Sequence, residues 1–360
     1  PWVAGLHHMT LTDPVDDQPM QALAFYPAIG ATRSSRIDGY PVDVAEEAPV
    51  ALGQFPLLVL SHGNTGSPLA LHYLATALAR QGFVVVAVVH PGDNARDHSR
   101  LGTLSNLYGR PLQVSAAITA ARDDALLGPY LNDGKVGVIG YSAGGETALI
   151  VSGAQPDLDR LRQYCLERPG DADACKTHGV LIADRSELAP EADARVGAVM
   201  LMAPLSLLFG RHALAGVQIP ALIYSGDSDQ LVAVDRNATE PMALVEGQQA
   251  STPARVLIAA SGATVNTGNT TVGLAPLPGN AQFTGNVLAD VRYADYSAYA
   301  KAMAWGIAFH EGDYGEAARL LGAPLPRRIR AVALPLARPA VAAGVALALM
   351  ETLADFGVAS

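Results

Sequence analysis

Ser142 stands in a pattern that is typical of a catalytic nucleophile. The apolar run 135–140 leads into Gly-Tyr-Ser-Ala-Gly at residues 140–144, a Gly-x-Ser-x-Gly pattern that a helix-like segment follows. A sharp turn between a strand and a helix lifts the serine hydroxyl clear of the sheet, and the residues two positions away must be glycine to avoid a collision. The start of the helix places the Ala143 N–H where it can stabilise an oxyanion. We expect Ser142 to be a nucleophile; the alternative is an ordinary glycine-rich turn.

A second strand end supplies a candidate partner for this N–H group. The run 57–61 (LLVLS) is followed by HGN at residues 62–64. A backbone N–H directly after such a strand is where a second oxyanion donor is expected, and each donor is worth about 2.7–4 kcal/mol of barrier. We assign this role to the Asn64 N–H and a structural role to His62, unless the segment merely turns the chain.

An acid and a histidine are expected after the serine, because the order in folds of this kind is Ser, Asp or Glu, His. Asp227 and Asp229 follow the apolar run 221–225, and we favour Asp229 as the acid that orients the histidine. His310 is the one histidine after Asp229, and we predict that it is the general base.

Two alternatives to His310 stay open. His178 or His212 could supply the base from an unusual position. The histidine could also be lost, which would leave the serine a poor nucleophile at neutral pH.

Apolar runs alternate with helix-like segments from residue 20 to residue 260. Several runs are nearly continuous and β-branched, as expected for strands that are buried on both faces of a parallel sheet. The alternation predicts an α/β fold with a doubly wound, mostly parallel sheet. The predicted strands are 21–27, 57–61, 83–89, 135–140, 197–203, 221–225 and 255–260, and the predicted helices are 68–81, 113–127 and 143–153.

Three segments break this alternation within what we expect to be one domain, 1–360. They are a cap or insert loop at 154–195, an irregular loop at 261–286 and a helical C-terminal extension at 287–360.

The composition excludes two broad classes of protein. Half of the 360 residues are hydrophobic and 16% are charged, which is the opposite of the low hydrophobicity and high charge of disordered chains. The net charge is −10 and no basic run occurs, so nucleic acid is excluded as a partner. The composition leaves the oligomeric state open.

The sequence predicts no metal and no organic cofactor. His90, Asp93 and His98 are ligand types, but capping of turns is their expected role. No Gly-Lys-Ser/Thr follows the serine motif, which excludes a phosphate-binding P-loop.

Cys165 and Cys175 are the two cysteines of the chain, and they lie in a polar stretch. With His178 they would offer a metal only three ligands at irregular spacing. We expect a disulfide, which requires an oxidising compartment, and hence an exported protein; the alternative is a cytoplasmic protein with two free thiols.

The tail contains an apolar stretch, 331–350, of about the length that crosses a bilayer. Arg338 lies within it, and Pro335 and Pro339 interrupt its first half. We therefore predict a packing helix and no transmembrane segment.

These motifs together resemble the α/β-hydrolases, in the branch that groups dienelactone-hydrolase-like proteins with platelet-activating-factor acetylhydrolase-like esterases. The resemblance spans residues 3–260. The segments that carry it are 55–67, 83–97, 136–149 and 219–232.

The resemblance implies the α/β-hydrolase fold and a carboxylic ester hydrolase. Ser142 would form an acyl-enzyme on a small-molecule ester or lactone, with Asp229 and His310 completing the triad. The chain departs from the family in having no histidine soon after the run 255–260. The alternatives are a non-catalytic or weakly active binding protein with the same fold, and an acyltransferase.

Overall fold

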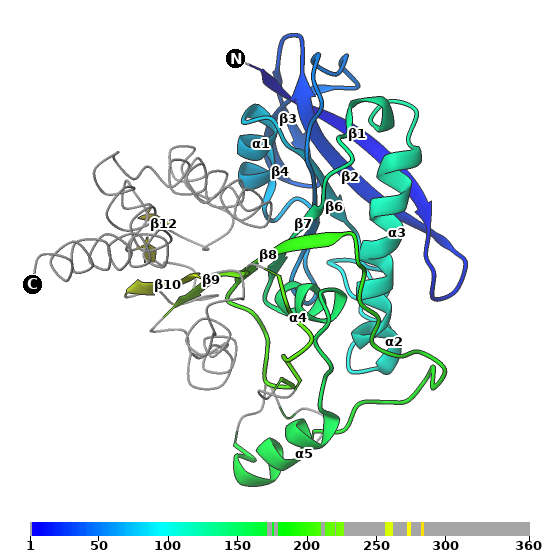
Figure 1. The fold of residues 1–360 in the computed structure, drawn as a ribbon, viewed down its shortest axis with the longest axis vertical. Helices are drawn as coiled ribbons and strands as arrows, with labels where there is room; N and C mark the ends of the chain where they lie inside the picture. The colour runs from blue at the N-terminus through cyan, green and yellow to red at the C-terminus, as the bar shows by residue number, and fades with distance from the viewer. Residues whose placement is uncertain are drawn as a thin grey trace, which may run out of the picture.

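One mixed β-sheet runs through the molecule, with α1 on one side and α3 and α4 on the other (Figure 1). The computed structural model describes residues 2–170, 175, 179–209, 213–219, 221–226, 256–261, 272–274 and 282–283. Its strands are β1 (Val3–Thr12), β2 (Pro19–Ala28), β3 (Arg33–Ile37), β4 (Tyr40–Glu46), β5 (Leu57–Ser61), β6 (Val84–Val88), β7 (Val136–Tyr141), β8 (Val196–Met202), β9 (Ala221–Gly226), β10 (Val256–Ser261), β11 (Val272–Leu274) and β12 (Gln282–Phe283). Its helices are α1 (His72–Arg80), α2 (Leu104–Leu107), α3 (Gly109–Asp123), α4 (Ala143–Val151), α5 (Leu158–Glu167) and a single 3₁₀ turn, Gly128–Tyr130.

The centre of the sheet is parallel. The strand order is β12-β11-β10-β9-β8-β7-β5-β6-β2-β1-β4-β3, and neighbours from β10 to β6 pair in parallel. Every residue of β5, β6 and β8 is buried, which explains their nearly continuous apolar sequences. Each predicted strand is present within a residue or two of its expected position, and the α/β class is confirmed.

The N-terminal part of the sheet is mostly antiparallel and was not predicted, apart from β2. β1 pairs with β2 along its whole length, from Val3 opposite Ala28 to Thr12 opposite Pro19, and β2 pairs with β6. β4 pairs with β1 in parallel, and β3 pairs with β4 antiparallel at the edge. The strands in this part mix polar and apolar residues, so their sequences carry a weaker signal than the central runs.

The three predicted helices are present with shifted ends. α1 begins at His72 and not at residue 68, since a turn precedes it. α3 begins at Gly109 and ends at Asp123, because Asp124 is extended and its carboxylate accepts hydrogen bonds from the N–H groups of Leu126 and Leu127.

The predicted insert and loop contain regular structure. Within 154–195, α5 starts at its cap Asp157, whose carboxylate accepts from the N–H groups of residues 159 and 160. Figure 1 shows α5 beyond α4, away from the central strands. Two short strands, β11 and β12, lie within 261–286, where the sequence predicts an irregular loop. Residues 287–360, the predicted helical extension, lie outside the described residues.

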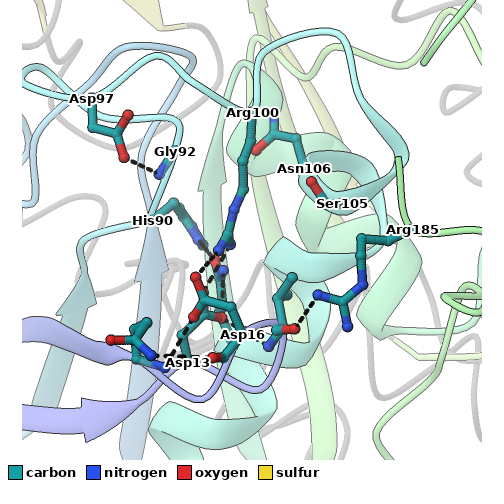
Figure 2. Close-up of polar contacts among 12 residues, drawn as sticks. Asp13, Asp16, His90, Gly92, Asp97, Arg100, Ser105, Asn106 and Arg185 are labelled. Carbon is teal, nitrogen blue, oxygen red and sulfur yellow. Dashed lines mark hydrogen bonds and ion pairs between the residues drawn. The ribbon is translucent and has the colours of Figure 1, made fainter. Parts of the chain in front are cut away.

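Arg100 ties the turn between β1 and β2 to the loop that follows β6. Figure 2 shows its guanidinium between Asp13 and Asp16, with nitrogen–oxygen distances of 2.8 and 2.6 Å. The other oxygen of Asp13 accepts from Gln113 Nε2 of α3 at 3.0 Å. Asp13 is fully buried, and these charged and polar partners compensate its loss of hydration.

His7 of β1 joins the segment after β4 to the end of α3. Its Nδ1 lies 2.6 Å from Glu47 Oε2 after β4, and its Nε2 lies 3.2 Å from Asp124 Oδ2 at the end of α3. Burial opposes the charge on His7, but the two carboxylates outweigh it and raise the pKa of the imidazole above 6.5. The protonated ring therefore stabilises the fold.

We predict that His7→Gln lowers the free energy of unfolding by about 0.5–1 kcal/mol near pH 6. A raised pKa means that this stabilisation is fully present below pH 6.5, while both carboxylates are ionised, and is lost as the pH rises through the pKa of the folded state. Urea unfolding between pH 5.5 and 8.5 measures it. His8→Gln is the matched control, because the His8 side chain is exposed. A difference between wild type and His7→Gln that does not shrink with rising pH would contradict the prediction.

Candidate functional site

Ser142 occupies the turn between β7 and α4 in a strained backbone conformation. Its φ of 53° and ψ of −117° lie in the region that favours glycine, which costs on the order of 1–3 kcal/mol for other residues. Main-chain hydrogen bonds hold it there: its N–H donates to the Met202 carbonyl at 3.0 Å, and its carbonyl accepts from Gly145 at 2.8 Å and Leu205 at 2.9 Å. The side chain stays partly exposed. Main-chain hydrogen bonds from β8, α4 and the segment after β8 thus hold the turn that carries the serine hydroxyl.

Two glycines make this turn possible. A Cβ on Gly140 would lie 2.0 Å from the Gly144 carbonyl oxygen, and a Cβ on Gly144 would lie 1.9 Å from the Ser61 carbonyl oxygen. Both contacts are with main-chain atoms, which cannot move aside as a flexible side chain would. The glycines on either side of Ser142 are therefore required by packing between β7, α4 and β5.

The loop after β5 lies directly beside the serine. A Cβ built on Gly63 would be 3.2 Å from Ser142 Cβ, and Asn64, the next residue, is exposed. Ala143 is the first residue of α4, where N–H groups have no partner within the helix. The structure thus brings Ser142, Ala143 and the 63–64 segment together.

His62 and His90 lie buried behind this loop, and hydrogen bonds fix both rings. His62 Nε2 accepts from the His90 N–H at 3.3 Å, so its Nδ1 carries the proton and donates to the Gly63 carbonyl at 2.7 Å. His90 lies 2.8 Å from Ser61 Oγ through Nε2 and 2.7 Å from Gln113 Oε1 through Nδ1. Burial, aided by the Arg110 charge, lowers the pKa of His62 to about 4 and that of His90 well below 6.5. Both rings are neutral at pH 7 and support the loop.

Glu146 lies in the first turn of α4 and is part-buried. Burial raises its pKa to about 8, although the Arg110 charge acts in the opposite direction. Its carboxyl group is therefore mostly protonated at pH 7. A neutral acid here leaves the positive end of the α4 dipole available to an oxyanion. Nothing in the sequence indicated this role.

The remaining predicted site residues fall in other parts of the chain. Asp229 and its alternative Asp227 lie outside the described residues, as do His310 and the alternatives His178 and His212. Among the described residues, no group of His, Cys, Asp and Glu side chains could hold a metal ion. An open groove of about 650 Å³ lies between β1 and α3, and Ser142 does not line it.

Residues 310–360 match the family model described as binding-protein-dependent transport system inner membrane component. No curated protein matches the chain, and no α/β-hydrolase family was found. In the part of the chain that the structure describes, no helix is both long and apolar enough to span a membrane.

The match corrects several expectations. The resemblance to dienelactone-hydrolase-like and acetylhydrolase-like proteins is wrong as a family assignment, and carboxylic ester hydrolysis on a Ser-Asp-His triad is overturned with it. The alternative of a binding protein with that fold is not supported either. The expected partners, a small ester and no membrane segment, are also wrong, because the matched family is a membrane component.

These errors have a physical source. The resemblance came from short segments at strand ends, and such segments specify a turn geometry that different reactions can share. The apolar stretch 331–350, for which the sequence predicts a packing helix, lies within the match and has about the length of a membrane span.

We predict that Gly144→Ala destabilises the fold by more than about 3 kcal/mol, because its Cβ would collide with the Ser61 carbonyl oxygen. Gly170→Ala is the matched control, since a Cβ there meets nothing within 4 Å. Thermal unfolding of the two variants measures the difference. Equal stability of both variants would show that β5 and α4 are not packed as closely as described.

Proposed function

We propose that the described part of the chain is an enzyme unit in which Ser142 attacks an electrophilic carbonyl carbon. The observation that carries the proposal is the strained backbone of Ser142, held by Met202, Gly145 and Leu205. Proteins retain such strain where function requires it, since the same serine in a relaxed turn would cost less. The substrate class is left open.

The surroundings of Ser142 suit the charge that this attack creates. Addition of the serine oxygen to a carbonyl produces an oxyanion, which backbone N–H groups stabilise. The Ala143 N–H at the start of α4 is one candidate donor, and the Asn64 N–H on the adjacent loop is the second. The neutral Glu146 adds no opposing charge at pH 7.

The reaction also needs a base that removes the proton of the serine hydroxyl. His62 and His90 do not fit this role, because both ring nitrogens of each are engaged in buried hydrogen bonds. The base is therefore left open, and Asp229 and His310 lie outside the described residues.

We expect a fluorophosphonate probe to label the protein at Ser142, because such probes react with activated serine hydroxyls. Ser142→Ala abolishes labelling. Ser152→Ala, at the other end of α4, leaves it unchanged, since the Ser152 hydroxyl donates to the Ala148 carbonyl. Mass spectrometry of the labelled peptide locates the adduct. An unlabelled wild-type protein, or labelling that survives Ser142→Ala, would refute the proposal.

We also propose that residues 310–360 associate with a membrane, as part of a transport system. The family match over these residues supports this second function, together with the apolar stretch 331–350. It is compatible with a catalytic unit elsewhere in the same chain.

We expect the full chain to sediment with membranes and to resist extraction by high salt. The double substitution Ala340→Arg/Ala343→Arg places two charges near the middle of the apolar stretch, at a cost of about 2.5–3.5 kcal/mol each in a bilayer, and shifts the protein to the supernatant. Ala354→Arg, beyond the stretch, is the control and stays with the membranes. Recovery of the wild-type chain in the supernatant would contradict the proposal.

An exported location is a further proposal, and the disulfide supports it. Cys165 on α5 is bonded to Cys175 with an S–S distance of 2.04 Å. Disulfides persist in oxidising compartments. Thiol titration of unfolded, unreduced protein from its native host is expected to find no free thiol, and two free thiols would contradict it.

A further inference from the structure

A buried ion pair braces the loop that lies beside Ser142. Arg110 of α3 and Asp93 of the loop after β6 are 2% and 0% exposed, and Arg110 Nη1 lies 2.8 Å from Asp93 Oδ2. Burying two such charges is costly, so their hydrogen bonds to other groups indicate the role of the pair.

The pair holds both ends of the segment that contains Gly63 and Asn64. At one end, Arg110 Nη2 donates to the His62 carbonyl and, at 3.2 Å, to Ser61 Oγ. At the other end, Asp93 Oδ1 accepts from the Thr65 N–H at 2.7 Å. The two residues between these anchor points are those beside the serine.

The braced segment is itself strained. Thr65 has a φ of 53°, which is rare for a β-branched residue. Such a conformation persists only when the surroundings fix it. The hydrogen bond from the Thr65 N–H to Asp93 supplies one fixed point, and the bond from the Ala95 N–H to the Gly66 carbonyl at 2.8 Å supplies another.

We propose that Arg110 and Asp93 are positioning residues that set the Gly63–Asn64 backbone against Ser142, and thereby the rate at which Ser142 reacts as a nucleophile. This inference rests on the proposed nucleophilic role of Ser142. Neither side chain touches the reacting atoms. The guanidinium suits this role because its two separated Nη groups contact different partners, whereas lysine carries its three donors on one nitrogen.

The test separates positioning from stability. Removal of one charge leaves the other buried and unpaired, which destabilises the fold. The double variant Arg110→Met/Asp93→Leu removes both charges, and apolar replacement of a buried pair is often neutral for stability. Arg110→Lys keeps the charge and the contact with Asp93 but loses the second anchor, so it serves as an independent variant.

Inactivation by a fluorophosphonate measures the effect as kinact and KI. We expect kinact to fall at least about tenfold in Arg110→Met/Asp93→Leu and in Arg110→Lys, with KI within about threefold of wild type, because a displaced oxyanion donor affects the transition state and not binding. Amide exchange at Thr65 is expected to accelerate in the double variant. Arg195→Met is the control: it breaks the ion pair with Asp193 before β8, away from residues 61–65, and leaves kinact unchanged.

A folded double variant, or a folded Arg110→Lys, with the wild-type kinact would overturn the inference. Absence of labelling in the wild-type protein would instead refute the nucleophilic role of Ser142, and the two failures are therefore distinguishable. Unchanged exchange at Thr65 in the double variant would overturn the inference without reference to any reaction.

Discussion

The strained backbone of Ser142 is the constraint on which the site depends. A serine with a φ of 53° between β7 and α4 is tolerated because β8, α4 and the segment after β8 each supply a main-chain hydrogen bond to it. The same geometry dictates the two flanking glycines, since a Cβ at either position would collide with main-chain oxygen. The conformation of Ser142 therefore depends on the spacing of the parallel strands, and the sheet is part of the site.

A network of buried polar side chains behind the loop after β5 also stabilises the site. Ser61, His90, Gln113 and Asp13 form a continuous chain of hydrogen bonds from β5 to the turn between β1 and β2, where Arg100 closes it. Because each member has partners, the chain avoids the penalty of unpaired buried polar groups. The turn between β1 and β2 is thus connected to the loop beside Ser142, although both strands lie far before the serine in the sequence.

The sequence predicted the features that local sterics determine and missed those that distant contacts create. The turn at Ser142 and the central strands were predictable, because glycine spacing and continuous apolar runs carry their own signal. β1, β3 and β4 were not predictable, since their sequences mix polar and apolar residues and these strands form by pairing with their neighbours. Arg110 and Asp93 were missed in the same way: one lies in a helix and the other in a turn, and only the fold pairs them. The family assignment failed because a turn geometry does not specify a reaction.

The central claim is that the fold imposes strain on residue 142, and comparison of Ser142→Gly with Ser142→Ala tests it most directly. Both variants lack the hydroxyl. In relaxed helix or strand positions, glycine is less stable than alanine by about 0.5–1 kcal/mol, whereas at a φ of 53° it relieves on the order of 1–3 kcal/mol of strain. Denaturant unfolding is therefore predicted to find Ser142→Gly the more stable of the two by about 1 kcal/mol. A more stable Ser142→Ala would show that the backbone at Ser142 is relaxed and would contradict the account.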